Sequence, residues 1–179
     1  MIFFKRDKDI HFDLYYKIVS ISREAGFYSK CKVPDTTDGR FEILLLHLII
    51  LIRKLKKDRK EQLSQSVVDL MFSSIDLSFR EEGVGDLSIP KKMKKVGMVF
   101  YGRSTSLEDI MDTQDALKKK KLLDDYFLRN AFFSDTSYKK NAGELSKYTI
   151  AFEELLEKVS ISEIPKLDTQ GIKGTTILN

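Results

Sequence analysis

Residues 43–52 read ILLLHLIILI, a run in which His47 is the one polar side chain. The polar segment VPDTTDG precedes the run at residues 33–39, and Arg53 and Lys54 follow it. Because a membrane span takes about 20 apolar residues, this run is too short to cross a bilayer. A helix that is apolar on every side must instead be surrounded by other helices. We therefore expect a helix that starts around the 33–39 turn, ends near residue 57 and lies at the centre of the fold.

Apolar residues recur at helical spacing on both sides of this run. Three prolines and nine glycines are few, and no alternating pattern is long enough to indicate a sheet. We therefore predict an all-α fold, a single compact helical domain of about six helices around the central apolar helix. The expected divisions are an N-terminal extension that forms part of the first helix (1–19), a helical domain (20–160) and a flexible tail (161–179). The other helices are expected at about residues 8–25, 60–82, 88–104 or beyond, 114–132 and 141–159.

Composition restricts the classes of function. The chain has 179 residues and a net charge of +4, and its single cysteine, Cys31, excludes an internal disulfide. With two histidines, His11 and His47, the chain has too few ligands for a recognisable zinc site. The N-terminal sequence MIFFKRDKD lacks the apolar segment of a secretory signal. We expect a soluble, cytoplasmic protein with no metal and no cofactor.

The segment FREEGVGDLSIPKKMKK, residues 79–95, raises the question whether its two glycines bind phosphate. A dinucleotide-binding loop follows a strand and has a third glycine, whereas this segment follows a predicted helix and has Ser88 at that position. Gly83 suits the left-handed residue that ends a helix, and Asp86 or Ser88 suits the N-cap of the next helix. The residues that we assign to structural turns are Asp35, Asp38, Gly39, Gly83, Gly85 and Asp86.

No constellation for covalent chemistry is evident. His11 and His47 fall on different predicted helices, and neither has a nucleophile motif beside it. A thiol–imidazole pair that uses Cys31 has no local support. Glu42 and His47 are five positions apart, which does not suit the Glu-x-x-His pairs of helical metal sites. We therefore predict that the protein is not an enzyme.

Cations gather in three segments: RKLKKDRK at 53–60, KKMKK at 91–95 and KKKK at 118–121. Such clusters bind RNA phosphates or anionic lipid, and they also occur as solvated faces of helices. The sequence leaves both interpretations open. The predicted basic surface comprises Arg53, Lys54, Lys57, Lys91, Lys92, Lys94 and Lys95.

Three motifs in order resemble the bacterial form of a known family: PDTTDGRFE at 34–42, REEGVGDL at 80–87 and FYGR at 100–103. Together they are similar to the ubiquinol–cytochrome c chaperone family, over roughly residues 20–160. The resemblance implies an assembly factor for the cytochrome bc complex, with newly made cytochrome b or a similar hydrophobic membrane protein as its client. Mitochondrial relatives act at the ribosome with a small helical partner protein. A ribosome, such a partner and the anionic surface of the inner membrane are therefore further expected contacts.

A chaperone for membrane segments needs an apolar groove with a polar rim. The helices predicted at 33–57 and 60–82 have apolar residues on more than one side, which suggests that part of this surface serves a client. Arg40 has an alternative role as the partner of Asp76 or Glu81, and Phe41 as a core residue. Gly102 either allows close approach of a helix or leaves a gap for a guest side chain. The candidate client-binding residues are Arg40, Phe41, Leu70, Leu77, Phe100, Tyr101 and Arg103. The alternative function is a basic helical module that associates with ribosomes or RNA.

Overall fold

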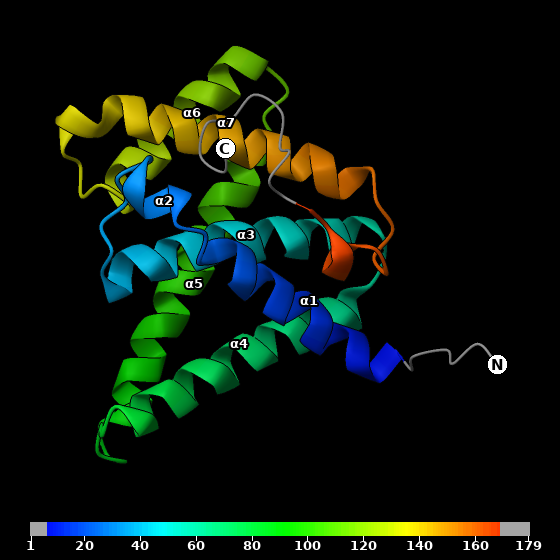
Figure 1. Cartoon of the computed structure of the whole chain (residues 1–179), viewed down its shortest axis with the longest axis vertical. Helices are drawn as coiled ribbons and strands as arrows, with labels where there is room; N and C mark the ends of the chain where they lie inside the picture. The colour runs from blue at the N-terminus through cyan, green and yellow to red at the C-terminus, as the bar shows by residue number, and fades with distance from the viewer. Residues whose placement is uncertain (1–6, 169–179) are drawn as a thin grey trace.

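The helix predicted from the apolar run, α3 (Thr37–Lys57), lies at the centre of the structure (Figure 1). The computed structural model describes residues 7–168. Six long helices and three short helical segments form this part of the chain, which confirms the predicted all-α fold. The other elements are α1 (Asp7–Ser22), α2 (Gly26–Ser29), α4 (Glu61–Glu81), α5 (Ile89–Met111), α6 (Ala116–Asn130), η1 (Thr136–Tyr138), α7 (Lys139–Glu157) and η2 (Ile164–Lys166).

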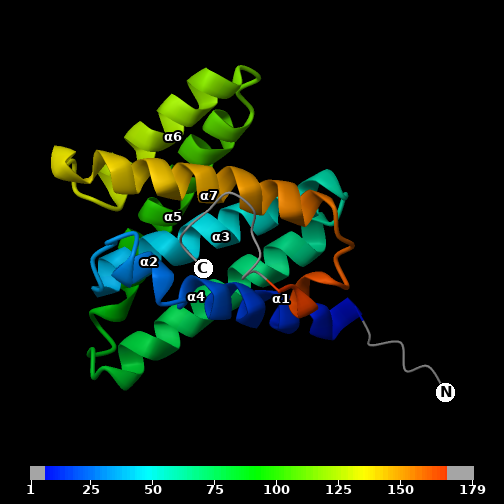
Figure 2. The same cartoon turned by 45° about the horizontal axis from the view of Figure 1, so that its top comes forward.

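Other helices enclose α3. Figure 2 shows α3 between α7 on one side and α1 with α4 on the other, and α5 also packs against it. Every residue from 45 to 52 is buried, so α3 has no solvent-facing side over this stretch. Burial of each Leu or Ile side chain stabilises the fold by roughly 1.5–3 kcal/mol. The apolar run is therefore the core against which the other long helices assemble.

The main difference from the predicted helix boundaries lies in the first helix. The first predicted helix, 8–25, is divided: α1 ends at Ser22, and the short α2 begins at Gly26 and buries Phe27. In this divided helix the tertiary packing of apolar side chains, which the local pattern does not include, determines where the chain turns. The helix expected at 88–104 or beyond does extend beyond residue 104, to Met111, as α5.

The C-terminal end of the described chain also differs from the expectation of a flexible tail from residue 161. Residues 161–168 include η2, which packs against α1, and Ile164 is fully buried. Residues 169–179, the remainder of the predicted tail, lie outside the described part of the structure.

A hairpin formed by α4 and α5 positions the candidate site. The turn at residues 82–88 projects at the lower edge of Figure 1, away from α6 and α7, and the two helices diverge from it. Gly83 in this turn has φ = +79°, the left-handed conformation that follows a helix C-terminus. Among residues 7–168, no helix combines the length and the apolar character that crossing a membrane requires.

Candidate functional site

A groove of about 730 Å³ lies between α1, the first half of α3, the second half of α4 and the first half of α5. Residues of the 34–42 and 80–87 motifs both line it. The half-buried apolar residues that line the groove are Val19, Phe41, Leu44, Ile75, Phe79, Val96 and Val99. The charged residues that line it are exposed: Arg23, Asp38, Arg40, Glu82, Lys92 and Lys95. The structure therefore has an apolar groove with a charged margin in which cations outnumber anions.

The turn before α3 positions one wall of this groove. The Thr36 hydroxyl caps α3 by accepting a hydrogen bond from the Gly39 amide at 3.2 Å. A Cβ atom at Gly39 would lie 2.0 Å from the carbonyl oxygen of Pro34, so the chain folds back too tightly for any side chain here. This tight turn places Asp38 and Phe41 at the groove. Phe41 also packs against the core, so both of its predicted roles are compatible with its position.

Arg40 does not reach Asp76 or Glu81 as the sequence suggested. Its Nε donates to Asp35 Oδ1 at 2.6 Å, and its guanidinium lies 6.0 Å from the centre of the Tyr28 ring. The hydrogen bond from Arg40 holds the pKa of the Asp35 carboxyl below its usual range. Both side chains are exposed, so this pair orients Arg40 at the margin of the groove and contributes little to stability.

The α4–α5 turn is held by a different arginine. Arg80 donates to Asp76 at 2.7 Å and to Asp86 at 2.8 Å. Asp86 therefore binds Arg80 and does not cap α5, and Ser88, the N-cap residue, makes no side-chain capping bond. The prediction of Asp86 as the cap is therefore wrong, whereas Ser88 holds the predicted N-cap position without a side-chain capping bond. A Cβ atom on Gly85 would contact nothing within 4 Å, so close packing does not require a glycine there.

Sequence reasoning missed the wall formed by α1. Tyr15 is buried where it lines the groove with Ser74 of α4, and burial raises the pKa of its hydroxyl. Tyr28, from α2, donates to the Ser22 carbonyl oxygen at 2.7 Å. Tyr15, Val19 and Ser22 follow one another at spacings of three and four residues along α1. That spacing was the available signal, but most of it falls in the segment 1–19 that was expected to be an extension.

The lysines at the start of α5 lie at or near the exposed margin of the groove. The ammonium of Lys92 lies 5.0 Å from the centre of the Phe79 ring, a cation–π contact at the groove. Lys91, Lys94 and Lys95 are exposed, and none of them forms an ion pair with a carboxylate among the described side chains, residues 10–168. Their charge is therefore available to an external anionic partner.

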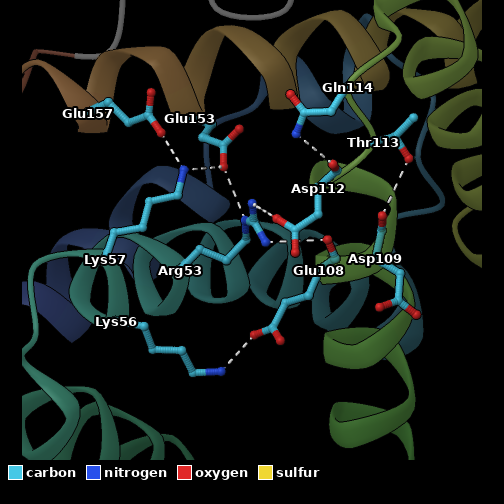
Figure 3. Close-up of polar contacts among 10 residues, drawn as sticks. All are labelled: Arg53, Lys56, Lys57, Glu108, Asp109, Asp112, Thr113, Gln114, Glu153 and Glu157. Carbon is cyan, nitrogen blue, oxygen red and sulfur yellow. Dashed lines mark hydrogen bonds and ion pairs between the residues drawn. The ribbon is translucent and has the colours of Figure 1, made fainter.

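The prediction that Arg53 belongs to the basic surface is wrong. Arg53 is only 7% exposed and donates to Asp112 at 2.8 Å, to Glu153 at 3.1 Å and to the Glu108 carbonyl at 3.3 Å. Figure 3 shows these contacts joining α3 to α5 and α7. Arg53 therefore holds three helices together.

The rest of the cationic cluster on α3 is paired as well. Lys56 binds Glu108 at 2.8 Å, and Lys57 binds Glu157 and, at 3.5 Å, Glu153 (Figure 3). Lys54 is mostly covered and pairs with Asp58 at 3.0 Å. Because these cations already have anionic partners, Lys54 and Lys57 are poor candidates for an external contact. The predicted basic surface is therefore reduced to its α5 lysines, since Arg53, Lys54 and Lys57 of α3 are all paired.

The FYGR motif has its aromatic and charged residues in separate environments. Phe100 is buried in the core with an edge-on contact to Phe72. The prediction that Phe100 contacts a client is therefore wrong. Arg103 binds both carboxylate oxygens of Glu42, at 2.8–3.0 Å, and joins α5 to α3. Burial raises the pKa of Glu42, and the bond from Arg103 opposes the rise. Only Tyr101 of this group has an exposed side chain.

The two leucines proposed for α4 lie outside the lining of the groove. Leu70 is half-buried against the core, whereas Leu77 is exposed. Gly102 has open space around it, because a Cβ atom there would contact nothing within 4 Å. The close helix approach suggested for Gly102 is therefore absent.

The titratable core groups are satisfied structural residues. The Cys31 thiol donates to the Asn141 carbonyl at 3.3 Å, and burial raises its pKa to about 12. His47 Nδ1 lies 2.7 Å from the Ile43 carbonyl, so this nitrogen donates and Nε2 accepts from the Tyr148 hydroxyl at 2.8 Å. Burial lowers the pKa of His47 to about 4. Within residues 7–168, no three His, Cys, Asp or Glu side chains gather in an arrangement that could hold a metal ion.

Comparisons with known proteins agree with the three motifs. A family model described as ubiquinol–cytochrome C chaperone matches residues 29–167, a range that includes all three motifs. The crystal structure of the Cbp3 homolog from Brucella abortus is similar, with a TM-score of 0.74 and 30% sequence identity. That likeness covers 89% of this chain and 86% of the Brucella chain. The comparison with curated proteins found no match.

Proposed function

Because this chain belongs to the ubiquinol–cytochrome c chaperone family, we propose that it is a non-catalytic assembly factor that binds newly made cytochrome b in its groove. Cytochrome b is held there while the cytochrome bc complex is built. The similar solved structure, a Cbp3 homolog, supports the same assignment.

The observation that carries the proposal is the groove itself. Its apolar lining comes from four helices. The 34–42 motif contributes Phe41 to that lining, and the 80–87 motif contributes Glu82 to the charged margin. A helix bound in a groove is recognised through apolar anchors spaced three and four residues apart. Val96, Val99 and Ile75 are half-buried and line the groove, so they can contact such anchors without a rearrangement of the core.

The charged margin supports binding of a membrane segment. An apolar segment of a membrane protein is bounded by polar loops, so a site for it needs an apolar centre and a polar edge. Lys92 and Lys95 lie at that edge with Arg23. Covering apolar area contributes about 25 cal/mol per Å² toward binding, part of which offsets the entropy lost on association. The charged margin keeps the unoccupied groove compatible with water.

The alternative, a basic module for ribosomes or RNA, is less well supported. The cationic cluster on α3 is committed to internal ion pairs, and Arg53 is buried among them. The remaining lysines of α5 surround or adjoin the apolar groove, which an RNA-binding surface does not require. We therefore place client binding first.

A substitution in the groove tests the proposal. Val96 is half-buried and lines the groove, so Val96→Glu places a charge against the client. We expect membranes of cells with this variant to contain less assembled cytochrome bc complex, measured by the absorbance of cytochrome b, while the purified variant melts as the wild type does. Leu117→Glu, at an exposed position of α6, is the matched control. Normal amounts of the complex with Val96→Glu would refute the proposal.

A further inference from the structure

One side of α5 and the preceding turn form an exposed face outside the groove. This docking face consists of Leu87, Lys91, Lys94, Met98 and Tyr101. Leu87 is 99% exposed, Met98 70% and Tyr101 62%. Within α5 the members are spaced three and four residues apart, so they lie on one side of the helix. Apolar and cationic side chains are therefore presented together to solvent.

The charge of the docking face is one-sided. From residue 87 to residue 107 the sequence contains no Asp or Glu. Lys91 and Lys94 form no ion pair with any side chain of residues 10–168. Of the acids in the adjoining turn, Asp86 is paired with Arg80, and Glu82 lines the groove. The face therefore complements an anionic surface.

The position of the face suits a flat partner. The α4–α5 turn, which contains Leu87, projects at the edge of the molecule, away from α6 and α7 (Figure 1). An extended surface can approach this edge without contacting the rest of the fold. A leucine that is fully exposed at such a tip has no role in packing the protein itself.

We propose that this face docks the protein on an anionic lipid bilayer. Lys91 and Lys94 lie at the headgroups, Leu87 enters the boundary of the acyl chains, and Met98 and Tyr101 lie in the interface. Helices that lie on membranes combine lysines with apolar side chains in this way. RNA phosphates would account for the lysines but not for Leu87. The proposal deepens the proposed function, because docking brings the adjacent groove to the membrane where a client inserts.

Vesicle binding tests the docking face without any client. The full chain is sedimented with vesicles of phosphatidylcholine mixed with phosphatidylglycerol, and with vesicles of phosphatidylcholine alone. Since each lysine near an anionic surface contributes about 1 kcal/mol, Lys91→Gln/Lys94→Gln should weaken binding to the anionic vesicles roughly 30-fold. Leu87→Ser should weaken it about tenfold or more. Both changes are at exposed positions, and thermal melts verify that the variants fold.

The matched control is Lys118→Gln/Lys121→Gln, which removes the same charge from exposed positions of α6. We expect it to change vesicle binding by less than about threefold. Equal losses for the two lysine pairs would overturn the proposal, because attraction would then depend on net charge alone. Unchanged vesicle binding by Leu87→Ser would also overturn it. Wild-type binding to an RNA oligonucleotide as tight as to the anionic vesicles would assign the lysines to phosphate recognition instead. None of these results bears on cytochrome b binding in the groove.

Discussion

Replacing Arg53 with methionine tests whether the cationic cluster on α3 is structural. Arg53→Met keeps an unbranched side chain of similar length and removes the hydrogen bonds to Asp112, Glu153 and the Glu108 carbonyl. The two carboxylates respond differently. The Asp112 side chain is 71% exposed, so its carboxylate is hydrated once Arg53 is removed. The Glu153 side chain is 15% exposed, and the ion pair that it keeps is the one with Lys57, at 3.5 Å.

The expected loss of stability lies between two limits. Removing one partner of a buried ion pair costs about 3–5 kcal/mol, and an exposed pair contributes about 0–1 kcal/mol. Since one of the two carboxylates is exposed and the other keeps a distant lysine, we expect a loss of about 2 kcal/mol. For a domain of this size that loss lowers Tm by roughly 4–8 °C.

The assay is thermal unfolding followed by far-ultraviolet circular dichroism, with Lys91→Met as the control for an exposed, unpaired cation. The control should change Tm by no more than about 1–2 °C. Arg53 lowers the pKa of Asp112, so the unfolded chain binds a proton at Asp112 more readily than the folded protein does. The stability from this pair is therefore present above the usual carboxyl pKa and is lost as pH falls below about 4. Equal melting of Arg53→Met and Lys91→Met at neutral pH would refute the structural role of Arg53.

Two further predictions concern the core and the tight turn. Burial lowers the pKa of His47 to about 4, so the unfolded chain gains a proton between the usual value of about 6.5 and pH 4 while the folded protein does not. Stability to urea should therefore fall by about 3 kcal/mol as pH falls through this range, and His47→Gln should weaken this dependence of stability on pH. An equally steep dependence on pH in His47→Gln would contradict the assignment of His47 as a buried, neutral group. Gly39→Ala should lose about 3 kcal/mol in the same assay, because its Cβ would collide with the backbone of Pro34. Gly102→Ala, with open space around the new methyl, should be neutral or gain up to about 1 kcal/mol, and equal effects of the two substitutions would contradict the steric argument.

The sequence predicted those features that depend on local patterns. The run at 43–52 is apolar all round, and such a helix has one stable place, at the centre of the bundle. The glycine at position 83 marks the end of α4 because its left-handed conformation strains other residues. Both signals lie within a few residues of the feature that they predict.

Features that depend on distant contacts were not predictable in this way. Arg53 lies in a cationic segment, but its partners Asp112 and Glu153 are 59 and 100 positions away. A cluster of cations therefore has the same local pattern whether it is solvated or paired. Phe100 and Tyr101 are adjacent and similar, and only the packing of α5 against α4 decides which is buried.

The groove was only partly predictable for the same reason. Arg40 and Phe41 follow from the motifs, but the wall from α1 lies in a segment that was expected to be an extension. Tyr15 and Val19 reach the groove because α1 packs against α3 and α4, an arrangement determined by the whole fold.

The central claim, that the groove holds newly made cytochrome b, is tested most directly by site-specific crosslinking. A photoreactive amino acid replaces Val96, which lines the groove, or Leu117, which is exposed on α6, in the full-length protein in its native host. After irradiation, the captured proteins are identified by mass spectrometry. The account predicts cytochrome b among the products at position 96 and not at position 117. Capture of cytochrome b equally at both positions, or its absence at position 96, would contradict the account.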